Sequence, residues 1–352
     1  MKAVGFTQHL PITDPASLQD FVLPDPVPGP RDLLVRVKAV AVNPVDTKVR
    51  GPRPGDPRHN PPKIIGWDAS GVVEAVGADV TLFAVGDEVY YAGNYSLPGS
   101  NAELQAIDER IVGRKPRTLA FADAAALPLT AITAWEGLFD RMHVRVGGED
   151  ASKSILIIGG AGGVGSVAIQ LAKHAGLMVI ATASRPESAA WVRELGADHV
   201  IDHTGDMPAQ LVALGIDGVH YVYSTYFIEQ HWAGIVAMLR PQGYVVAIDS
   251  ATDIDLAQLK QKSGTFAWEF MFTRSMFQTD DMAEQGKLLN AVSELIDEGK
   301  LRGTVGQWMS PINAENLREA HRQLEGLGVI GKIVLEGWEV TTQQRVHLRI
   351  SG

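Results

Sequence analysis

The chain has 352 residues, of which 45% are apolar and 20% charged, so its composition is that of a globular protein of about two domains and not of a disordered chain. With 31 basic and 41 acidic residues its net charge is −10, which disfavours nucleic acid and anionic membranes as partners. The absence of cysteine excludes disulfides, thiolate nucleophiles, iron–sulfur clusters and cysteine-ligated zinc.

The first part of the chain is typical of a β domain. Short apolar or alternating segments at 33–42, 71–77 and 85–91 are expected to form strands, and the proline-rich segment 51–62 is expected to be a loop. The N-terminus lacks the apolar core of a signal peptide. We therefore expect a mostly antiparallel, barrel-like domain in a cytoplasmic enzyme.

From residue 122 the pattern changes to alternating helices and strands. An alanine-rich helix over 122–138 is interrupted at Pro128, and the continuous apolar run 154–158 indicates a strand buried on both faces of a parallel sheet. Further elements are expected as strands at 177–182, 199–202, 218–223 and 243–249 and helices at 164–175, 187–195 and 232–239. This order predicts an α/β fold with a doubly wound parallel sheet. Glycines interrupt the apolar stretch 154–172, so it is not expected to span a membrane.

The end of the chain is expected to return to the first domain. Residues 285–296 predict an amphipathic helix and 331–335 a strand, while the pattern of the tail, 338–352, predicts no element. The predicted domains are therefore 1–127 with 282–352, and 128–281.

A glycine-rich motif follows the buried strand. Gly160, Gly162 and Gly165 satisfy G-x-G-x-x-G between a strand and a helix, the context in which glycines let a pyrophosphate approach the helix N-terminus. A glycine-rich turn without a ligand is the alternative. The predicted dinucleotide-binding residues are Gly160, Ala161, Gly162, Gly163, Val164 and Gly165.

The residues after the next strand favour NADPH over NADH. No acidic residue stands at the end of that strand, where NAD enzymes bind the ribose hydroxyls. Ser184 and Arg185 stand there instead, and an arginine suits a 2′-phosphate. A solvated arginine at a helix start is the alternative.

These features together resemble the medium-chain dehydrogenase/reductase superfamily. The resemblance covers residues 2 to 335 and is most similar to the zinc-independent quinone oxidoreductase (zeta-crystallin-like) branch, with bacterial relatives labelled zinc-type alcohol dehydrogenases. It implies a GroES-like β domain, a Rossmann domain and NADPH-dependent reduction of quinones or α,β-unsaturated carbonyls. Besides the glycine motif, the matching segments are 43–46, 66–73, 86–89, 129–131, 195–198 and 331–335.

Two positions bear on zinc. Where zinc-binding members of the superfamily have a ligating cysteine and histidine, this chain has Asn43 and Trp67, and neither is a good zinc ligand. No metal site is therefore expected. Reduction of a conjugated carbonyl then depends on hydrogen-bond donors, and Asn43 offers an amide N–H₂ to a substrate oxygen, with a turn-forming role as the alternative.

Three further residues are candidates for the catalytic site. Asp46 would hold the nicotinamide ribose or orient a water, or else cap a short helix. Trp67 would form an apolar wall over the substrate or pack in the core. Tyr91 would donate its hydroxyl at the mouth of the cleft, although alternation places only one of Tyr90 and Tyr91 inward.

Four residues complete the predicted cofactor site. The resemblance places Thr130 near the nicotinamide and His203 beside the adenosine; Thr130 could instead bond only a carbonyl of its own helix. Thr225 follows the fourth strand of the parallel sheet, where the chain passes the cofactor. Lys332, after a glycine, would contact a phosphate or be solvated.

The expected partners are a small carbonyl substrate and a second copy of the chain. An apolar cluster is expected to line the cleft, form a dimer contact or pack in the core; it consists of Phe270, Met271, Phe272, Met276 and Phe277. Two alternative functions are a zinc-type alcohol dehydrogenase and a non-catalytic NADPH-binding sensor, because a fold does not determine activity.

Overall fold

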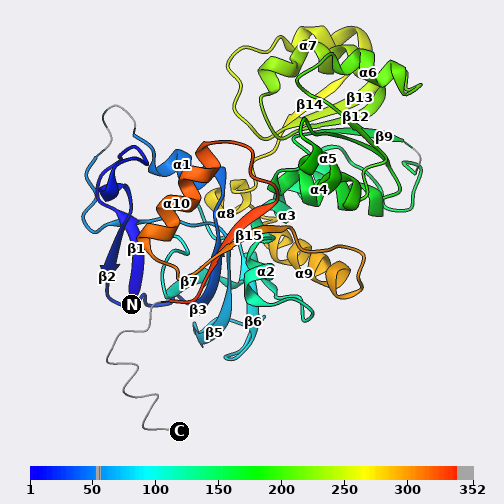
Figure 1. Ribbon diagram of the computed structural model, residues 1–352. Coiled ribbons are helices and arrows are strands. Elements are labelled where there is room, and N and C mark those ends of the chain that lie inside the picture. Colours follow the sequence, from blue (N-terminus) through cyan, green and yellow to red (C-terminus); the bar gives the residue numbers. More distant parts are fainter. Residues whose placement is uncertain (53–54, 56, 152, 339–352) are drawn as a thin grey trace.

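The computed structural model describes residues 1–52, 55, 57–151 and 153–338 and has two domains (Figure 1). The tail left without a predicted element, apart from Trp338, lies outside the described residues. In the described part, no helix combines the length and apolar character needed to cross a membrane. The stretch 154–172 contains the buried strand β9 (Ser154–Ile158) and most of the helix α4 (Gly163–His174).

The middle of the chain forms a six-stranded parallel sheet in the order β11-β10-β9-β12-β13-β14. The chain moves outward from β9 to β11 and then returns to build the other half, so the strand order reverses between β9 and β12. Such a switch point opens a crevice at the carboxyl ends of the strands. The strands are β9 (Ser154–Ile158), β10 (Met178–Thr182), β11 (His199–Ile201), β12 (Val219–Ser224), β13 (Leu239–Ala247) and β14 (Thr265–Trp268).

Helices cover this sheet, which confirms the predicted doubly wound α/β fold. All five residues of β9 are buried, as the continuous apolar run predicts for a central parallel strand. The helices of this domain are α3 (Pro128–Trp135), the π-helix η3 (Glu136–Arg141), α4 (Gly163–His174), α5 (Pro186–Glu194), α6 (Met207–Ala213), α7 (Ile228–Met238), the 3₁₀ helix η4 (Leu256–Lys262) and α8 (Thr273–Phe277).

The remaining chain forms the predominantly antiparallel domain. One sheet has seven strands, in the order β15-β16-β3-β5-β6-β8 with β7 also on β3, and a second sheet has the order β2-β1-β4. Only β15 and β16 pair in parallel in these two sheets as described. The strands are β1 (Lys2–Phe6), β2 (Gln19–Val22), β3 (Asp32–Ala41), β4 (Lys63–Ile64), β5 (Ala69–Val76), β6 (Glu88–Tyr91), β7 (Leu104–Asp108), β8 (Val112–Arg114), β15 (Val305–Met309) and β16 (Lys332–Glu336).

The C-terminal segment returns to this domain, as predicted. Strand β16 pairs with β3, and Tyr90 on β6 donates a hydrogen bond to the carbonyl of Leu289 in the helix α9. The exact domain boundaries stay a prediction. The helices of this domain are α1 (Pro44–Arg50), α2 (Phe121–Ala125), α9 (Glu284–Asp297), α10 (Ala314–Glu325) and two 3₁₀ turns, η1 (Pro15–Ser17) and η2 (Glu109–Ile111).

Candidate active site

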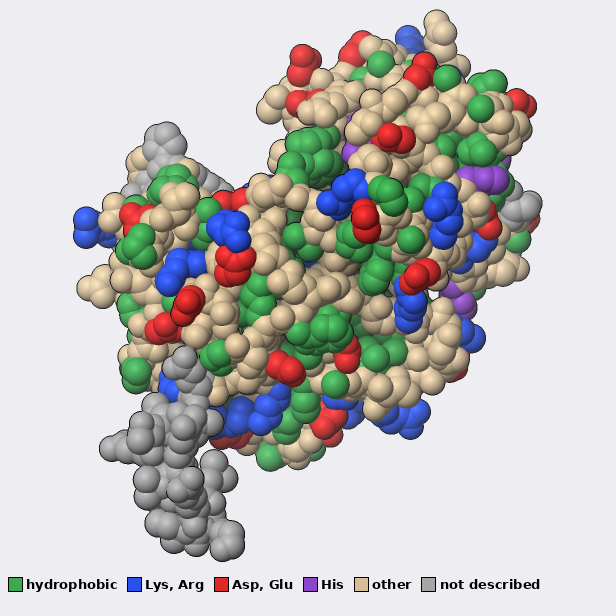
Figure 2. Space-filling model, viewed as in Figure 1, with side chains coloured by type: hydrophobic (Ala, Val, Ile, Leu, Met, Phe, Trp, Pro, Cys, Tyr) green, Lys and Arg blue, Asp and Glu red, His purple; other side chains and the backbone are tan. Residues whose placement is uncertain are grey.

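A cavity of about 1690 Å³ lies between the two domains. The parallel-sheet domain contributes the loops at the carboxyl ends of β9, β10, β12 and β13, and the other domain contributes α1 and the segment before β16. The outline of the molecule is indented between these domains (Figure 2). The cavity therefore coincides with the switch point, where doubly wound folds bind ligands.

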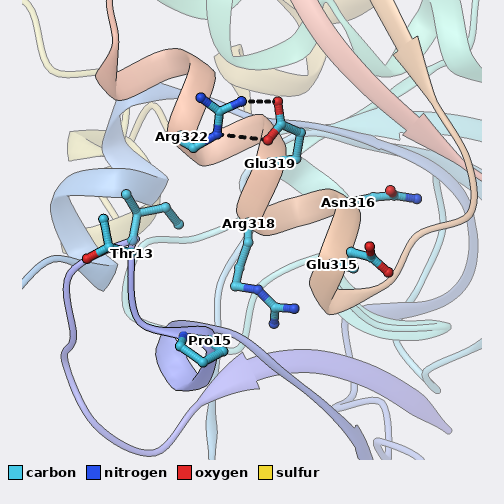
Figure 3. A pocket seen from close by; sticks show the side chains of 8 residues that line it. Thr13, Pro15, Glu315, Asn316, Arg318, Glu319 and Arg322 are labelled. Carbon is cyan, nitrogen blue, oxygen red and sulfur yellow. Dashed lines mark hydrogen bonds and ion pairs between the residues drawn. The ribbon is translucent and has the colours of Figure 1, made fainter.

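A second, smaller hollow of about 410 Å³ lies between α10 and the segment around Pro15 (Figure 3). Three of its charged side chains are bonded within the protein. Arg322 pairs with Glu319 at 2.5 Å, and Arg318 donates to the carbonyl of Leu18. The large cavity is therefore the candidate site.

The glycines between β9 and α4 have separate structural tasks. Gly159 has a positive φ of 82°, which favours glycine. A Cβ at Gly165 would lie 2.3 Å from the carbonyl oxygen of Gly159, and one at Gly160 would lie 2.9 Å from the Cβ of Ala181. At Gly162 the nearest atom to such a Cβ is 3.5 Å away. Gly160 and Gly165 thus permit the tight turn, while Gly162 leaves room on the cavity side.

The predicted phosphate loop divides accordingly. Ala161, Gly162, Gly163 and Val164 line the cavity at the N-terminus of α4, whereas Gly160 and Gly165 lie behind them. A helix of twelve residues that begins at a cavity offers unpaired N–H groups and positive potential to a phosphate. The loop therefore fits the pyrophosphate of a dinucleotide.

The predicted adenosine-side residues also line the cavity. Ser184 and Arg185 lie between β10 and α5, and Arg185 Nη2 donates to the carbonyl of Gly328 at 2.6 Å. His203 and Thr225 lie at the same cavity, and the Thr225 hydroxyl donates to the carbonyl of Ile158 at 2.8 Å.

Four buried polar atoms at this end of the cavity have no hydrogen-bond partner in the described part of the chain. They are His203 Nδ1, the Tyr226 hydroxyl, His231 Nε2 and Asp249 Oδ1. The His203 and His231 rings meet edge to face at 6.0 Å, and burial lowers the pKa of His231. The donors and acceptors suit a polar ligand such as a nucleoside.

Three of these four residues were not predicted from the sequence. Tyr226 follows β12 and Asp249 follows β13, so both stand at the carboxyl ends of predicted strands. Doubly wound folds bind ligands at the carboxyl ends of their strands, so this position in the sequence could have identified Tyr226 and Asp249 as candidates. His231 lies within α7, and no sequence motif marks it.

A buried polar network lies where the two domains meet. Asn43 Nδ2 donates to Asp68 Oδ2 at 2.8 Å, and the Lys332 ammonium donates to the same oxygen at 2.8 Å. Lys332 also donates to Asn43 Oδ1 and to the carbonyl of Val42. The second oxygen of Asp68 accepts the N–H of Leu129 at 2.7 Å. Both charged groups are buried, with 0% of the Asp68 side chain and 4% of Lys332 exposed.

Lys332 differs from its prediction in one respect. The solvated-lysine alternative is wrong because the side chain is buried and bonded to three oxygens, although it lines the cavity. An ammonium has three N–H groups, so a phosphate contact would require one of these bonds to break. Thr130 lines the cavity as well, while its hydroxyl donates to the carbonyl of Leu127 at 2.9 Å.

Asp46 supports the chain around Asn43 and does not reach the cavity. Its Oδ2 accepts the backbone N–H of Asn43 at 2.6 Å, at the start of α1. Asn43 is the N-cap of α1, and Asp46 stands at the third helical position and completes the capping interaction, so the predicted N-cap role belongs to Asn43. Asp46 does not line the cavity, and a ribose contact is not seen. Burial raises the pKa of Asp46 to about 7, against the opposing effects of the Asn43 N–H and Lys332. Burial also raises the pKa of Asp68, again opposed by Lys332.

Trp67 and Tyr91 lie behind the cavity wall and do not line it. Trp67 is 1% exposed and stacks on Tyr95 with ring centroids 5.4 Å apart, so core packing is its role and the wall over the substrate is not. Tyr91 is fully buried, which contradicts a place at the cleft mouth. Tyr90 is buried as well, so the expectation that one of the two tyrosines points outward is wrong, because the Tyr90 hydroxyl is covered by α9.

The apolar side of the cavity comes from Tyr95, Phe270, Met271 and Phe272. Tyr95 was not predicted. Three of the five residues of the predicted apolar cluster thus line the cleft, while Met276 and Phe277 do not, and Phe277 is 71% exposed.

A pair of buried glutamates next to this apolar wall was also not predicted. Glu269 lines the cavity, and its side chain lies within hydrogen-bonding reach of that of Glu136. Arg141 Nε donates to Glu269 at 3.0 Å and Arg274 Nη1 to Glu136 at 2.7 Å. Burial and the neighbouring carboxylate raise the pKa of Glu269 to about 9.

The donor set does not fit a zinc ion. Asn43 and Asp68 already coordinate a cation, the ammonium of Lys332, and a second positive charge beside it would be repelled. Trp67 directs its indole N–H to the carbonyl of Asn94. Among the residues that the structure describes, no three His, Asp or Glu side chains are grouped to hold a metal.

Comparison with known proteins gives consistent matches over both domains. Residues 29–127 match the family described as the alcohol dehydrogenase GroES-like domain, and residues 163–285 match that described as zinc-binding dehydrogenase. A zinc-type alcohol dehydrogenase-like protein of Staphylococcus epidermidis is 39% identical over 339 residues, which are 95% of this chain and 99% of that protein.

Two crystal structures show how closely the fold is shared. A protein of Rhizobium etli named as a candidate zinc-dependent alcohol dehydrogenase is 53% identical, with a TM-score of 0.92 over 97% of this chain and 99% of that one. A quinone oxidoreductase of Pseudomonas syringae pv. tomato is 28% identical, with a TM-score of 0.77 over 96% and 99%.

Proposed function

Because this chain belongs to the medium-chain dehydrogenase/reductase superfamily and is an NAD(P)H-dependent oxidoreductase, we propose that it transfers a hydride from NADPH to a quinone or an α,β-unsaturated carbonyl without a metal. One observation carries the proposal. The cavity that begins at the phosphate loop reaches Asn43, a hydrogen-bond donor held in a buried network that already contains a cation. The name of the Pseudomonas relative, a quinone oxidoreductase, supports the same substrate class.

The bound cofactor would supply the hydride, and the protein would stabilise the charge that follows. When hydride adds to the far carbon of a conjugated carbonyl, negative charge collects on the carbonyl oxygen. The Asn43 amide would donate a hydrogen bond to that oxygen. Hydrogen-bond donors alone can stabilise the charge of an enolate, whereas reduction of a simple ketone depends more on a Lewis acid. Tyr95, Phe270 and Phe272 would hold the apolar part of the substrate. Water would supply the proton that completes the product.

NADPH is favoured over NADH by the cavity wall after β10. Ser184 and Arg185 line the cavity there, and neither is acidic. A guanidinium makes charge-assisted hydrogen bonds to a phosphate, which NADPH carries at the 2′ position and NADH lacks. Ser188, in the first turn of α5, lines the same region.

The test is the loss of nicotinamide absorbance with a panel of quinones, enones, ketones and aldehydes, with NADPH and NADH compared. We expect quinones or enones with NADPH to be reduced fastest, and Arg185→Ala to weaken NADPH about tenfold or more while changing NADH little. Exposed Arg193→Ala on the same helix is the control. Equal weakening of both cofactors would contradict the 2′-phosphate contact.

The alternatives give different results in the same experiment. A zinc-type alcohol dehydrogenase would contain stoichiometric zinc by metal analysis and prefer simple alcohols or aldehydes. A non-catalytic sensor would bind NADPH and oxidise none with any acceptor. A second copy of the chain is the expected protein partner, and nucleic acid and membranes are not expected. The cytoplasmic location stays a prediction.

A further inference from the structure

The Asn43 amide is held from two sides by groups of opposite chemistry. Lys332 can only donate hydrogen bonds, so the atom facing it must be the amide oxygen; Asp68 as a carboxylate can only accept, so the atom facing it must be the amide nitrogen. The chemistry of the neighbours therefore determines the orientation of the amide. One N–H of Nδ2 is bonded to Asp68, and a primary amide has a second.

This arrangement also affects the strength of that second donor. A cation that donates to an amide oxygen polarises the amide and makes its N–H groups better donors, and the effect is larger in a buried site. Lys332 is 4% exposed and Asn43 is buried, so little solvent screens the interaction. Asn43 nevertheless lines the cavity.

Lys332 is in turn anchored to the phosphate loop of the other domain. The N–H of Gly331 donates to the carbonyl of Ala161 at 2.9 Å, and Gly331 forms a β-bridge with Gly162. The stem of Lys332 lies 2.9 Å from the point where a Cβ at Gly163 would be. The position of the ammonium is therefore set by contacts in both domains.

We propose that Lys332 and Asp68 are positioning residues, which together hold the Asn43 amide with its second Nδ2–H directed to the substrate oxygen, and that the Lys332 ammonium strengthens this donor. The inference rests on the proposed function. It assigns to Lys332 a role on the substrate side and not at a phosphate.

The first test is a double-mutant cycle in steady-state kinetics, with NADPH and the best acceptor. We expect Asn43→Ala to lower kcat about 100-fold, as for loss of one oxyanion donor, and Lys332→Met to lower it about tenfold or more. The double variant should be no slower than Asn43→Ala, because both changes remove the same interaction. The Kd for NADPH should change less than about threefold. The exposed Lys260→Met is the control.

A second variant distinguishes a specific effect on kcat from loss of folding. Lys332→Met leaves Asp68 as an unpaired buried carboxylate, so Lys332→Met/Asp68→Asn is made in parallel, which removes both charges. The unfolding midpoint of each variant is measured. If this neutral pair folds like the wild type and retains wild-type kcat, the proposal is wrong.

A binding measurement keeps the test independent of turnover. A short saturated amide such as propanamide presents a carbonyl oxygen but is not reduced by a nicotinamide. Calorimetry on the NADPH-loaded protein should show binding that weakens about fivefold or more in Lys332→Met, with no further loss when Asn43→Ala is added. If no acceptor is reduced but this coupling appears, the proposed function fails and the positioning role stands.

Other outcomes overturn the positioning role. The role is excluded if the wild type does not bind the amide. It is also excluded if the double variant weakens amide binding by the product of the two single fold-changes, because Lys332→Met and Asn43→Ala would then act independently. It is also excluded if Lys332→Met weakens NADPH tenfold or more, in a salt-dependent way, and leaves amide binding unchanged. That last result would assign Lys332 to a phosphate.

Discussion

Glu136 and Glu269 place two carboxyl groups in a buried site that one shared proton would stabilise. Glu136 Oε2 and Glu269 Oε1 have no hydrogen-bond donor among the described residues, although the two side chains are neighbours. A protonated Glu269 could donate to Glu136, while Arg141 and Arg274 stabilise the remaining charge. Two adjacent ionised carboxylates would repel each other.

This pair predicts how stability depends on pH. The pKa of Glu269 is raised from 4.5 to about 9, so the folded protein binds a proton that the unfolded chain releases between these values. Its contribution to the free energy of unfolding is present at low pH and is lost as the pH rises through about 9. Glu269→Gln mimics the protonated form and should lose less stability over this range than the wild type.

The measurement is the unfolding midpoint from pH 5 to 9. A differential effect of about 1 kcal/mol corresponds to roughly 2 °C in a protein of this size. The exposed Glu298→Gln is the control and should follow the wild type. Parallel curves for the wild type and Glu269→Gln would show that the pair holds no shared proton in the folded state.

The placement of single residues at the cavity was predicted well where the reason was local and poorly where it was not. Gly162 and Arg185 line the cavity because strand, turn and helix follow one another in the sequence. Asn43 and Lys332 are 289 positions apart, and only the pairing of β16 with β3 brings them together. Trp67 occupies the position where zinc-binding members of the superfamily have a ligating histidine, but its side chain is buried in the core.

The elements of the parallel sheet show the same dependence on local pattern. Strand β9 was predicted with the bounds that it has, because a continuous apolar run is typical of a central parallel strand. Strand β14 was not predicted. It has four residues at the edge of the sheet, none of them buried, and its three consecutive apolar residues are too few for periodicity to distinguish a strand.

The turn into α4 yields a prediction from two glycines of the same motif. Gly165→Ala should lower the free energy of unfolding by about 3 kcal/mol, since its Cβ would lie 2.3 Å from the Gly159 carbonyl oxygen. Gly162→Ala should cost less than about 1 kcal/mol, because its nearest neighbour is 3.5 Å away. Its methyl group would instead occupy space on the cavity side and weaken NADPH at least about tenfold.

Denaturant unfolding and NADPH fluorescence titration measure the two effects separately. The variants serve as controls for each other, because one is expected to change stability and the other affinity. If Gly162→Ala binds NADPH as the wild type does, the pyrophosphate does not approach the loop at this point.

In the molecule as a whole, the two domains are connected through the cavity as well as along the chain. The Gly331–Ala161 hydrogen bond and the Lys332 network join the substrate side to the phosphate loop. A ligand that fills the cavity contacts residues of both domains. The sequence predicted both domains from composition and periodicity, but this junction depends on contacts between distant segments.

The open edge of the parallel sheet leads to the last prediction, that the protein is a homodimer. Strand β14 ends the sheet, with no further described strand beside it, and Trp268 at the end of β14 is 46% exposed. Exposed edges with aromatic side chains favour pairing, and two copies related by a twofold axis would join their β14 edges into one continuous sheet.

Light scattering should give twice the chain mass of 37.9 kDa for the wild type. Trp268→Glu should shift the mass towards that of a single chain, because it places a charge in the interface. Val27→Glu, at a residue that is 88% exposed in the other domain, should leave it unchanged. A wild-type mass of one chain would contradict the homodimer, and an unchanged dimer in Trp268→Glu would place the interface away from β14.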